Sequence, residues 1–138
     1  MAADSSFPAG CRMFEIGIAD EFEAAHALKG DFGPATRLHG HTYRVEVRVE
    51  AREVDETGVF YDLGRLRADL RAALEEMHYR NLNDLAALSE VNTTAEMVAR
   101  HIFTRLEPPL RASGVTSLKV TVWESPSVFA SFRETFDG

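Results

Sequence analysis

The segment RLHGHTYRVEVRVEAR, residues 37–52, shows the clearest alternation of apolar and charged residues in the chain. Odd positions from 43 to 51 are apolar or aromatic, whereas even positions from 44 to 50 are charged. Successive side chains of a strand point to opposite faces, so this pattern predicts a strand with one buried face and one solvated face. The residues on the predicted buried face are Tyr43, Val45, Val47, Val49 and Ala51.

A similar pattern upstream predicts a first strand that begins near Met13 and reaches His26. Its apolar residues share one parity and would therefore lie on one face, with an interruption at Asp20. They are Phe14, Ile16, Ile18, Phe22 and Ala24, and His26 continues their parity. The two strands are close enough along the chain to form a hairpin.

Two helices are expected to follow. The first begins near Leu63 with Asp62 as its N-cap, and it carries an apolar stripe at helical spacing. The second opens at Thr93, because Thr93 and Glu96 have the spacing of a capping box. It is predicted to stop at the prolines of EPPL, residues 107–110, since proline opposes helix continuation. The predicted stripe of the first helix consists of Leu63, Leu66, Leu70, Leu74 and Met77.

Two further alternating segments, residues 118–123 and 128–133, predict strands near the C-terminus. The order of two strands, two helices and two strands favours an α+β fold, with an antiparallel sheet covered by helices on one face. A four-stranded sheet leaves two unpaired edges. Pairing these edges between subunits would close the sheets into a barrel, so we expect an oligomer.

Length and composition predict one globular domain over residues 13–138, after a disordered segment at residues 1–12. The chain has 138 residues, and its single cysteine, Cys11, cannot form an internal disulfide. There is no apolar run of transmembrane length and no secretory signal pattern, so we expect a cytoplasmic protein. The net charge of −7 disfavours nucleic-acid binding. Arg37 and Arg80 could still create a local pocket for a small anion.

Three histidines would meet at the mouth of the predicted hairpin. His26 ends the first strand, while His39 and His41 begin the second and share a direction because they are two residues apart. Zinc binds imidazole nitrogens, and three protein ligands leave a fourth position for water or substrate, as in catalytic sites. The alternative interpretation is that His39 and His41 are hairpin-end residues bonded to backbone, with His26 alone beside a strand.

The motifs FEAAH, RLHGHTY, RNLND, TTAE and WESP, in this order, resemble those of the 6-pyruvoyltetrahydropterin synthase and 6-carboxytetrahydropterin synthase family. The resemblance implies a tunnelling fold, in which trimers close a barrel and two trimers stack as a homohexamer. It also implies that His26, His39 and His41 bind Zn²⁺. Glu124 of WESP would hold the pterin ring through paired hydrogen bonds, with a further contact from Thr94. Otherwise Glu124 is an exposed strand-end carboxylate and Thr94 a plain first-turn residue.

The sequence departs from the family pattern where protons are transferred. Ala35 occupies the position of a cysteine base, and His78 and Tyr79 occupy the positions of an aspartate and a histidine. His78 and Tyr79 could form a replacement acid/base pair, or they could be an exposed helix-end histidine and a packing aromatic. Asp31 and Glu23 are further candidates for the missing base.

Three functional hypotheses remain from the sequence. The first is a zinc-dependent lyase that breaks a carbon–oxygen or carbon–carbon bond in a pterin-type substrate, with the usual reaction made doubtful by the replaced relay. The second is a non-catalytic, oligomeric pterin-binding protein, which Ala35 favours. The third is a zinc hydratase or hydrolase that uses metal-bound water. Glu124 favours a pterin-type ligand over the third hypothesis.

Overall fold

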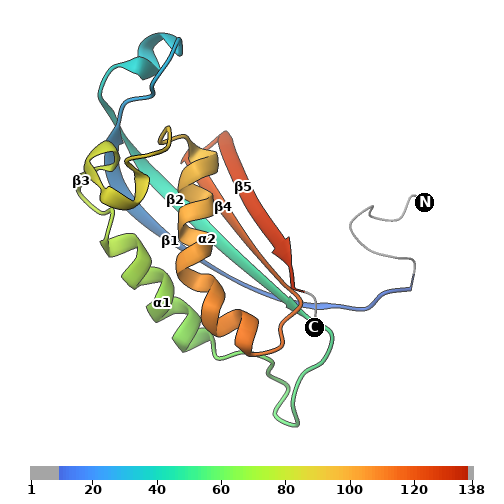
Figure 1. Cartoon of the computed structure of the whole chain (residues 1–138). Helices are drawn as coiled ribbons and strands as arrows, with labels where there is room; N and C mark the ends of the chain where they lie inside the picture. Colours follow the sequence, from blue (N-terminus) through green and yellow to red (C-terminus); the bar gives the residue numbers. More distant parts are fainter. Residues whose placement is uncertain (1–9, 137–138) are drawn as a thin grey trace.

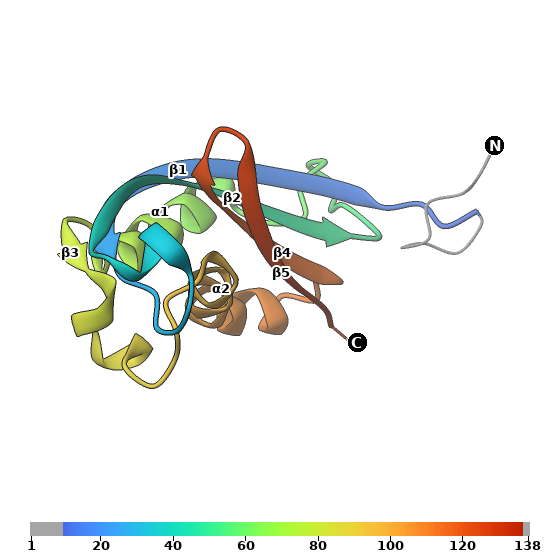
Figure 2. The ribbon, with the colours of Figure 1, turned by 90° about the horizontal axis from the view of Figure 1, so that it is seen from above.

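A twisted five-stranded sheet carries two helices on one of its faces (Figures 1 and 2). The computed structural model describes residues 10–136. Most of the predicted disordered segment, residues 1–9, lies outside the described residues, as do residues 137–138. The strands follow the order β3-β1-β2-β4-β5 across the sheet. Their bounds are β1 Phe14–His26, β2 His39–Ala51, β3 Arg80–Asn81, β4 Ser117–Ser125 and β5 Val128–Thr135, and the helices are α1 Leu63–Glu75 and α2 Ala95–Ala112.

The predicted α+β architecture is confirmed, with one correction. The sheet is mixed rather than purely antiparallel, because β3 pairs in parallel with Ala24 and Ala25 of β1. A two-residue strand has no periodicity, so its pattern could not be recognised in the sequence. Within residues 10–136 neither helix is both long enough and apolar enough to cross a lipid bilayer.

Strands β1 and β2 form a long antiparallel ribbon with unbroken register from the pair Phe14 and Ala51 to the pair His26 and His39. The prediction of one strand through Asp20 is confirmed, since Asp20 interrupts only the apolar pattern and pairs directly with Val45. Its carboxylate accepts a hydrogen bond of 3.1 Å from Arg71 of α1, so a charged residue is accommodated without breaking the strand.

The core lies between the helices and the inner face of the sheet. All five predicted positions of β2 are buried there, from Tyr43 to Ala51. The apolar stripe of α1 is buried against β1 and α2, except that Leu63, the first helical residue, is 44% exposed. Met77 is buried although α1 ends at Glu75. The apolar side chains that α2 contributes are Val98, Ile102, Phe103, Leu106 and Leu110.

Helix α2 differs from its prediction at both ends. Its N-cap is Thr94, whose hydroxyl accepts from the Met97 N–H at 3.3 Å, and the predicted cap Thr93 is buried before the helix. The helix also continues through Pro108 and Pro109 to Ala112. The missing proline N–H groups leave carbonyls four residues earlier without their helical partners. Thr104 and Arg105 carry these carbonyls and are exposed, so water can donate to them.

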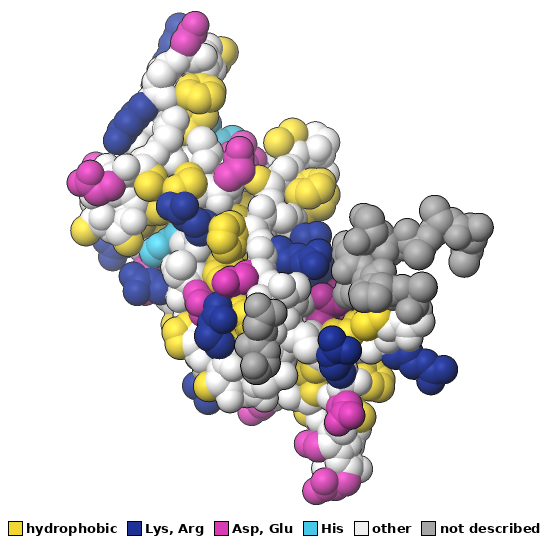
Figure 3. Space-filling model, turned by 45° about the vertical axis from the view of Figure 1, so that its right-hand side comes forward, with side chains coloured by type: hydrophobic (Ala, Val, Ile, Leu, Met, Phe, Trp, Pro, Cys, Tyr) yellow, Lys and Arg dark blue, Asp and Glu magenta, His cyan; other side chains and the backbone are white. Residues whose placement is uncertain are grey.

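Two segments project from opposite ends of the ribbon (Figures 1 and 3). Residues 27–38 connect β1 to β2 and contain the short 3-10 helix η1 (Gly33–Thr36). At the other end, the turn after β2 carries the exposed acidic residues Glu53, Asp55 and Glu56. Asp55 closes this turn by accepting from the backbone N–H groups of Thr57 and Val59. The candidate site lies at the end that carries residues 27–38.

Candidate metal centre

Three imidazoles converge where the ribbon opens into residues 27–38. His26 and His39 are direct cross-strand partners, and His41 lies two residues further along β2 on the same face. The ring centroids are 4.6 Å apart for His26 and His39, 5.1 Å for His26 and His41, and 4.8 Å for His39 and His41. Ligand atoms of the three side chains all lie within 4.8 Å of one another. The predicted convergence is therefore confirmed.

Two of the rings are held by backbone carbonyls through Nδ1. His26 Nδ1 lies 2.7 Å from the Thr93 carbonyl oxygen, and His39 Nδ1 lies 2.7 Å from that of Arg37. A carbonyl oxygen can only accept, so each Nδ1 carries the hydrogen and each Nε2 keeps its lone pair. Histidines that ligate metals are typically oriented by such a second hydrogen bond.

The Nε2 atom of His26 is available to bind a ligand. His26 is only 1% exposed, and within residues 10–136 its Nε2 makes no hydrogen bond. A buried polar atom without a partner is costly, and such atoms are rare in native proteins. A metal ion that accepts the Nε2 lone pair would remove this cost, so the donor set fits a zinc-type cation.

The surroundings keep His26 neutral, as metal binding requires. Burial lowers the pKa of His26, and the imidazoles of His39 and His41 lower it further, against the opposing effects of the Thr93 carbonyl and Glu124. Below the cluster, the ring of Tyr43 stacks on Phe22 at a centroid distance of 4.7 Å. Burial also raises the pKa of the Tyr43 hydroxyl, which therefore stays protonated on this apolar floor.

Glu124 approaches the cluster from β4. It keeps the parity of the core residues Val120 and Val122, and it lies at an irregularity in register between Trp123 and Ser125. Such bulges redirect side chains and are common beside functional sites. The carboxylate is close enough to raise the pKa of both His26 and Tyr43. The structure thus brings Glu124 to the same side of the sheet as the histidines, and its contact with a ligand stays a prediction.

Thr94 lies one residue beyond the carbonyl that holds His26. Its hydroxyl is already engaged in capping α2, where it accepts from Met97. The same oxygen has a second lone pair and one hydrogen to offer, so capping leaves its predicted ligand contact open.

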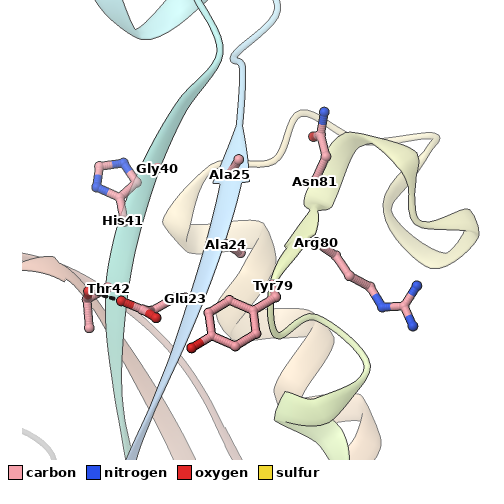
Figure 4. A pocket seen from close by; sticks show the side chains of 9 residues that line it. All are labelled: Glu23, Ala24, Ala25, Gly40, His41, Thr42, Tyr79, Arg80 and Asn81. Carbon is pink, nitrogen blue, oxygen red and sulfur yellow. Dashed lines mark hydrogen bonds between the residues drawn. The ribbon is translucent and has the colours of Figure 1, made fainter.

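A hollow of about 520 Å³ opens beside His41, which is the one histidine of the cluster among its lining residues (Figure 4). Tyr79 projects its ring across β1 near Glu23, whereas the Arg80 side chain points away from this hollow (Figure 4). The Glu23 carboxylate accepts a hydrogen bond of 3.2 Å from the Thr42 hydroxyl. The residues that line the hollow are Glu23, Ala24, Ala25, Gly40, His41, Thr42, Tyr79, Arg80 and Asn81. A predicted metal ligand, His41, and a predicted acid/base residue, Tyr79, therefore border one space.

The turn that carries His78 and Tyr79 is fixed to Glu23 by two backbone contacts. The Glu23 N–H donates to His78 Nδ1 at 3.1 Å, and the Tyr79 N–H donates to the Glu23 carbonyl at 2.6 Å. The two rings lie 3.9 Å apart. Tyr79 is 76% exposed and has a φ of 58°, which is uncommon for a bulky side chain. Tyr79 is therefore not a buried packing aromatic.

The remaining predicted base positions lie in the projecting segment. Ala35 belongs to η1, and its carbonyl accepts from the Leu28 N–H at 2.9 Å. Its methyl group can neither take up nor release a proton. Asp31 and Arg37 are both exposed in the same segment. The Arg37 side chain does not line the hollow that Arg80 borders, so the predicted pairing of these two cations in one pocket does not occur there.

Comparison with known proteins identifies the family of this chain. Residues 15–135 match the family model of 6-pyruvoyl tetrahydropterin synthase. The chain belongs to this family. A 6-carboxy-5,6,7,8-tetrahydropterin synthase of Haemophilus influenzae is 26% identical over 88% of this chain and 100% of that protein. A protein named putative 6-pyruvoyl tetrahydrobiopterin synthase in Caenorhabditis elegans is 31% identical over 83% of this chain and 90% of its own length.

Solved structures show the same fold. The 6-pyruvoyl tetrahydropterin synthase of Caenorhabditis elegans superposes with a TM-score of 0.77 and 28% sequence identity, over 89% of this chain and 96% of that one. The Plasmodium falciparum enzyme gives a TM-score of 0.74 at 15% identity, over 89% of this chain and 98% of that one. The second comparison concerns the fold alone.

The two carbonyls that orient the cluster could not be predicted from the sequence. They belong to Thr93 and Arg37, and any residue type could have supplied them. A backbone acceptor has no signature in a single sequence, and only the fold shows which carbonyl faces which ring. The convergence of the three histidines was predictable from the sequence, whereas the tautomers of His26 and His39 were not.

Proposed function

We propose that this member of the 6-pyruvoyl tetrahydropterin synthase family is a zinc-dependent lyase that acts on a dihydropterin-type substrate through a rebuilt proton-transfer apparatus. The observation that carries this proposal is the buried, unpartnered Nε2 of His26, which faces two further imidazoles on a face shared with Glu124. A site of this kind can bind one end of a ligand at the metal and the other at a carboxylate.

His26, His39 and His41 would hold the zinc ion and leave one position open. Bound zinc supplies Lewis-acid polarisation of an oxygen on the substrate side chain. The chain's own contribution is to orient the rings of His26 and His39 through the Thr93 and Arg37 carbonyls and to keep His26 neutral by burial. The apolar floor formed by Tyr43 and Phe22 excludes water beneath the cluster and strengthens electrostatic interactions there.

Glu124 would select the pterin ring. The aminopyrimidinone edge of a pterin offers two adjacent N–H donors, and a carboxylate can accept both of them. Such a paired interaction fixes the ring in one orientation and thereby directs the side chain at C6 toward the metal. This arrangement favours a pterin-type ligand over the small substrates of a zinc hydratase or hydrolase.

Proton transfer would fall to groups that border the hollow beside His41. Tyr79 offers a phenolic donor and Glu23 a carboxylate acceptor. His78 is less suited to act as a base, because its Nδ1 lone pair already accepts from the Glu23 N–H. It can still donate from Nε2 and position Tyr79, on which its ring stacks.

A non-catalytic pterin-binding protein is the second candidate. Ala35 favours it, since the family's cysteine base is missing, and so does the engaged Nδ1 of His78. Both candidates require zinc and pterin binding, and they differ in whether the bound ligand is converted.

Metal analysis of the purified protein, combined with a binding screen of dihydropterins with and without the triphosphate chain, tests the proposal. We expect one zinc per subunit, a dihydropterin ligand, and slow conversion of that ligand detected by product chromatography. Binding without conversion would support the non-catalytic alternative. A protein that binds neither zinc nor pterin would exclude both candidates.

The free edges of the sheet support assembly into a homohexamer with barrels closed between subunits. β3 covers β1 only at Ala24 and Ala25, and β5 is the opposite edge strand. Val128 and Phe129 at the tip of β5 are more than half exposed, at 54% and 55%. Pairing β5 with β1 of a neighbour would satisfy both edges. A monomeric mass in light scattering at micromolar concentration would contradict this assembly.

A further inference from the structure

The side chains of Asn83 and Asn92 form hydrogen bonds with the backbone immediately after His26. The Ala27 N–H donates to Asn83 Oδ1 at 2.8 Å, and Asn83 Nδ2 donates back to the Ala27 carbonyl at 3.0 Å. Two residues later the pattern recurs, because the Lys29 N–H donates to Asn92 Oδ1 at 2.8 Å and Asn92 Nδ2 donates to the Lys29 carbonyl at 2.9 Å. Each amide thus makes the paired bonds that a neighbouring strand would make.

Both asparagines reach across the fold from distant parts of the sequence. Asn83 belongs to the short 3-10 helix η2 (Leu82–Asp84) and lies 56 positions from Ala27. Asn92 precedes α2 and lies 63 positions from Lys29. These contacts therefore fix the start of the segment 27–38 to the body of the domain, in place of the β-sheet pairing that ends at His26.

The paired hydrogen bonds between Asn92 and Lys29 complete a closed loop of contacts that includes His26. Asn92 is adjacent to Thr93, whose carbonyl lies 2.7 Å from His26 Nδ1. Lys29 lies three residues after His26 and is hydrogen-bonded to Asn92. Thr93, the next residue, contacts the His26 ring through its carbonyl. If the hydrogen bonds between Asn92 and Lys29 are lost, the Thr93 carbonyl is no longer held in position relative to the His26 ring.

The same segment also supports the second held histidine. Its two sides are joined where the Leu28 N–H donates to the Ala35 carbonyl at 2.9 Å. The segment then reaches Arg37, whose carbonyl orients His39. Both carbonyl acceptors of the cluster therefore belong to chain segments that Asn83 and Asn92 tie together.

We infer that Asn83 and Asn92 are positioning residues of the metal centre, which hold His26 and His39 in the tautomers and orientations that bind zinc. The inference rests on the proposed zinc site. Neither asparagine touches the metal ligands directly, and both act through the backbone. Partners that orient metal ligands commonly change metal affinity by about 10- to 100-fold when they are removed.

The test compares zinc affinity in the parent and in Asn92→Leu, which keeps the approximate volume but removes all four hydrogen-bonding capacities. The zinc dissociation constant is measured by competition with a chromophoric chelator, and the visible absorption of the Co²⁺-loaded protein reports ligand geometry. Asp55→Ala is the matched control. It removes a side chain that likewise accepts hydrogen bonds from backbone N–H groups, in the turn after β2 at the opposite end of the ribbon. Circular dichroism confirms folding at the temperature of measurement.

We expect Asn92→Leu to weaken zinc binding by about 10- to 100-fold and to alter the Co²⁺ spectrum, with Asp55→Ala unchanged in both. Asn83→Leu should weaken binding in the same direction. Equal zinc affinity in Asn92→Leu and the parent would overturn the inference while leaving the zinc site intact, and so would an equal loss in Asp55→Ala. A parent without zinc would instead overturn the proposed function. If Asn92→Leu is unfolded, Asn92→Ser is scored by the same criteria.

Discussion

The histidine cluster and the turn of His78 and Tyr79 lie at the same end of the sheet, but their side chains are held in opposite ways. In the cluster, carbonyl oxygens face Nδ1 of His26 and His39, so each Nε2 is free to bind a cation. In the turn, an N–H faces Nδ1 of His78, so the free position of that ring is a donor. His26 is buried, whereas Tyr79 is exposed. The first arrangement suits metal binding, and the second suits contact with a ligand or partner.

This difference separates a cluster that is held through backbone carbonyls from a turn whose aromatic side chain faces solvent. The cluster depends on backbone geometry, because carbonyls of Thr93 and Arg37 orient the rings of His26 and His39. The turn depends on only two backbone contacts with Glu23, and its side chains point outward. If the two regions are as independent as their contacts indicate, changes in one should leave the other intact.

The largest effect is expected from the double change His39→Ala and His41→Ala. Two of three ligands are lost, and a single imidazole cannot hold zinc at micromolar concentration. We expect about one zinc per subunit in the parent and almost none in the variant, measured by elemental analysis after dialysis. His78→Ala is the control and should retain the parental zinc content. Loss of zinc in His78→Ala would show that the two regions are not independent.

The second effect concerns proton transfer. The parent should show little or no 6-pyruvoyltetrahydropterin synthase activity, because Ala35, His78 and Tyr79 replace the relay that the family resemblance implies. General acid/base groups contribute roughly 10²- to 10⁴-fold. The triple change Ala35→Cys, His78→Asp and Tyr79→His should therefore raise turnover of dihydroneopterin triphosphate above the parent, with zinc content unchanged.

Ala35→Ser combined with the same two changes is the matched control, since a hydroxyl has the size of a thiol but is far less acidic. This control should stay near the parental rate. Robust turnover by the unmodified protein would contradict the prediction and would point to Tyr79, Glu23 or Asp31 as the working base. Single substitutions of these three residues would then identify it.

A smaller loss is expected at Glu124. Hydrogen bonds to a charged group contribute about 1.5–3 kcal/mol, so Glu124→Ala should weaken dihydropterin binding by roughly 10- to 150-fold. Isothermal titration measures the affinity, and elemental analysis should show unchanged zinc. Glu124→Gln keeps the shape but replaces one acceptor oxygen with a donor, so it should bind nearly as weakly. Parental affinity in both variants would refute the ring-anchor role.

Periodicity predicted most of the fold because a sheet with one buried face requires it. The alternation from Tyr43 to Ala51 could place β2 and its core face, and parity alone could align His26 with His39 and His41. The helices were predictable from their apolar stripes. The Thr94 cap was not, because Thr93 and Thr94 are both good capping residues and the choice depends on the burial of Thr93.

Features that depend on tertiary contact could not be read from the sequence. The strand β3 has two residues and exists because β1 offers a free edge. The passage of α2 through Pro108 and Pro109 depends on solvent access to two carbonyls. In the site, Asn83 belongs to the RNLND motif, but this motif does not indicate that the Asn83 amide binds the backbone beside His26. Zinc, the homohexamer and the role of Thr94 stay predictions.

The smallest effect separates backbone strain from side-chain contact at Tyr79. A non-glycine residue in the left-handed region costs about 1–2 kcal/mol, and the φ of Tyr79 is 58°. Glycine removes this cost but increases the entropy lost on folding, by about 0.5–1 kcal/mol relative to alanine. Tyr79→Gly should therefore be more stable than Tyr79→Ala by roughly 0.5–1 kcal/mol. Urea unfolding of both variants measures the difference.

The comparison is informative because both variants lose the phenol ring and its stacking on His78, so these losses cancel between them. Ala72→Gly supplies the reference, since Ala72 is an exposed residue of α1 and the same change there should destabilise by about 0.5–1 kcal/mol. Opposite signs at the two positions would show that the fold holds Tyr79 under strain, as expected where an exposed ring is kept for ligand contact. The same sign at both would mean that the turn relaxes in solution. Tyr79 would then have no more claim to a functional role than any other exposed aromatic residue.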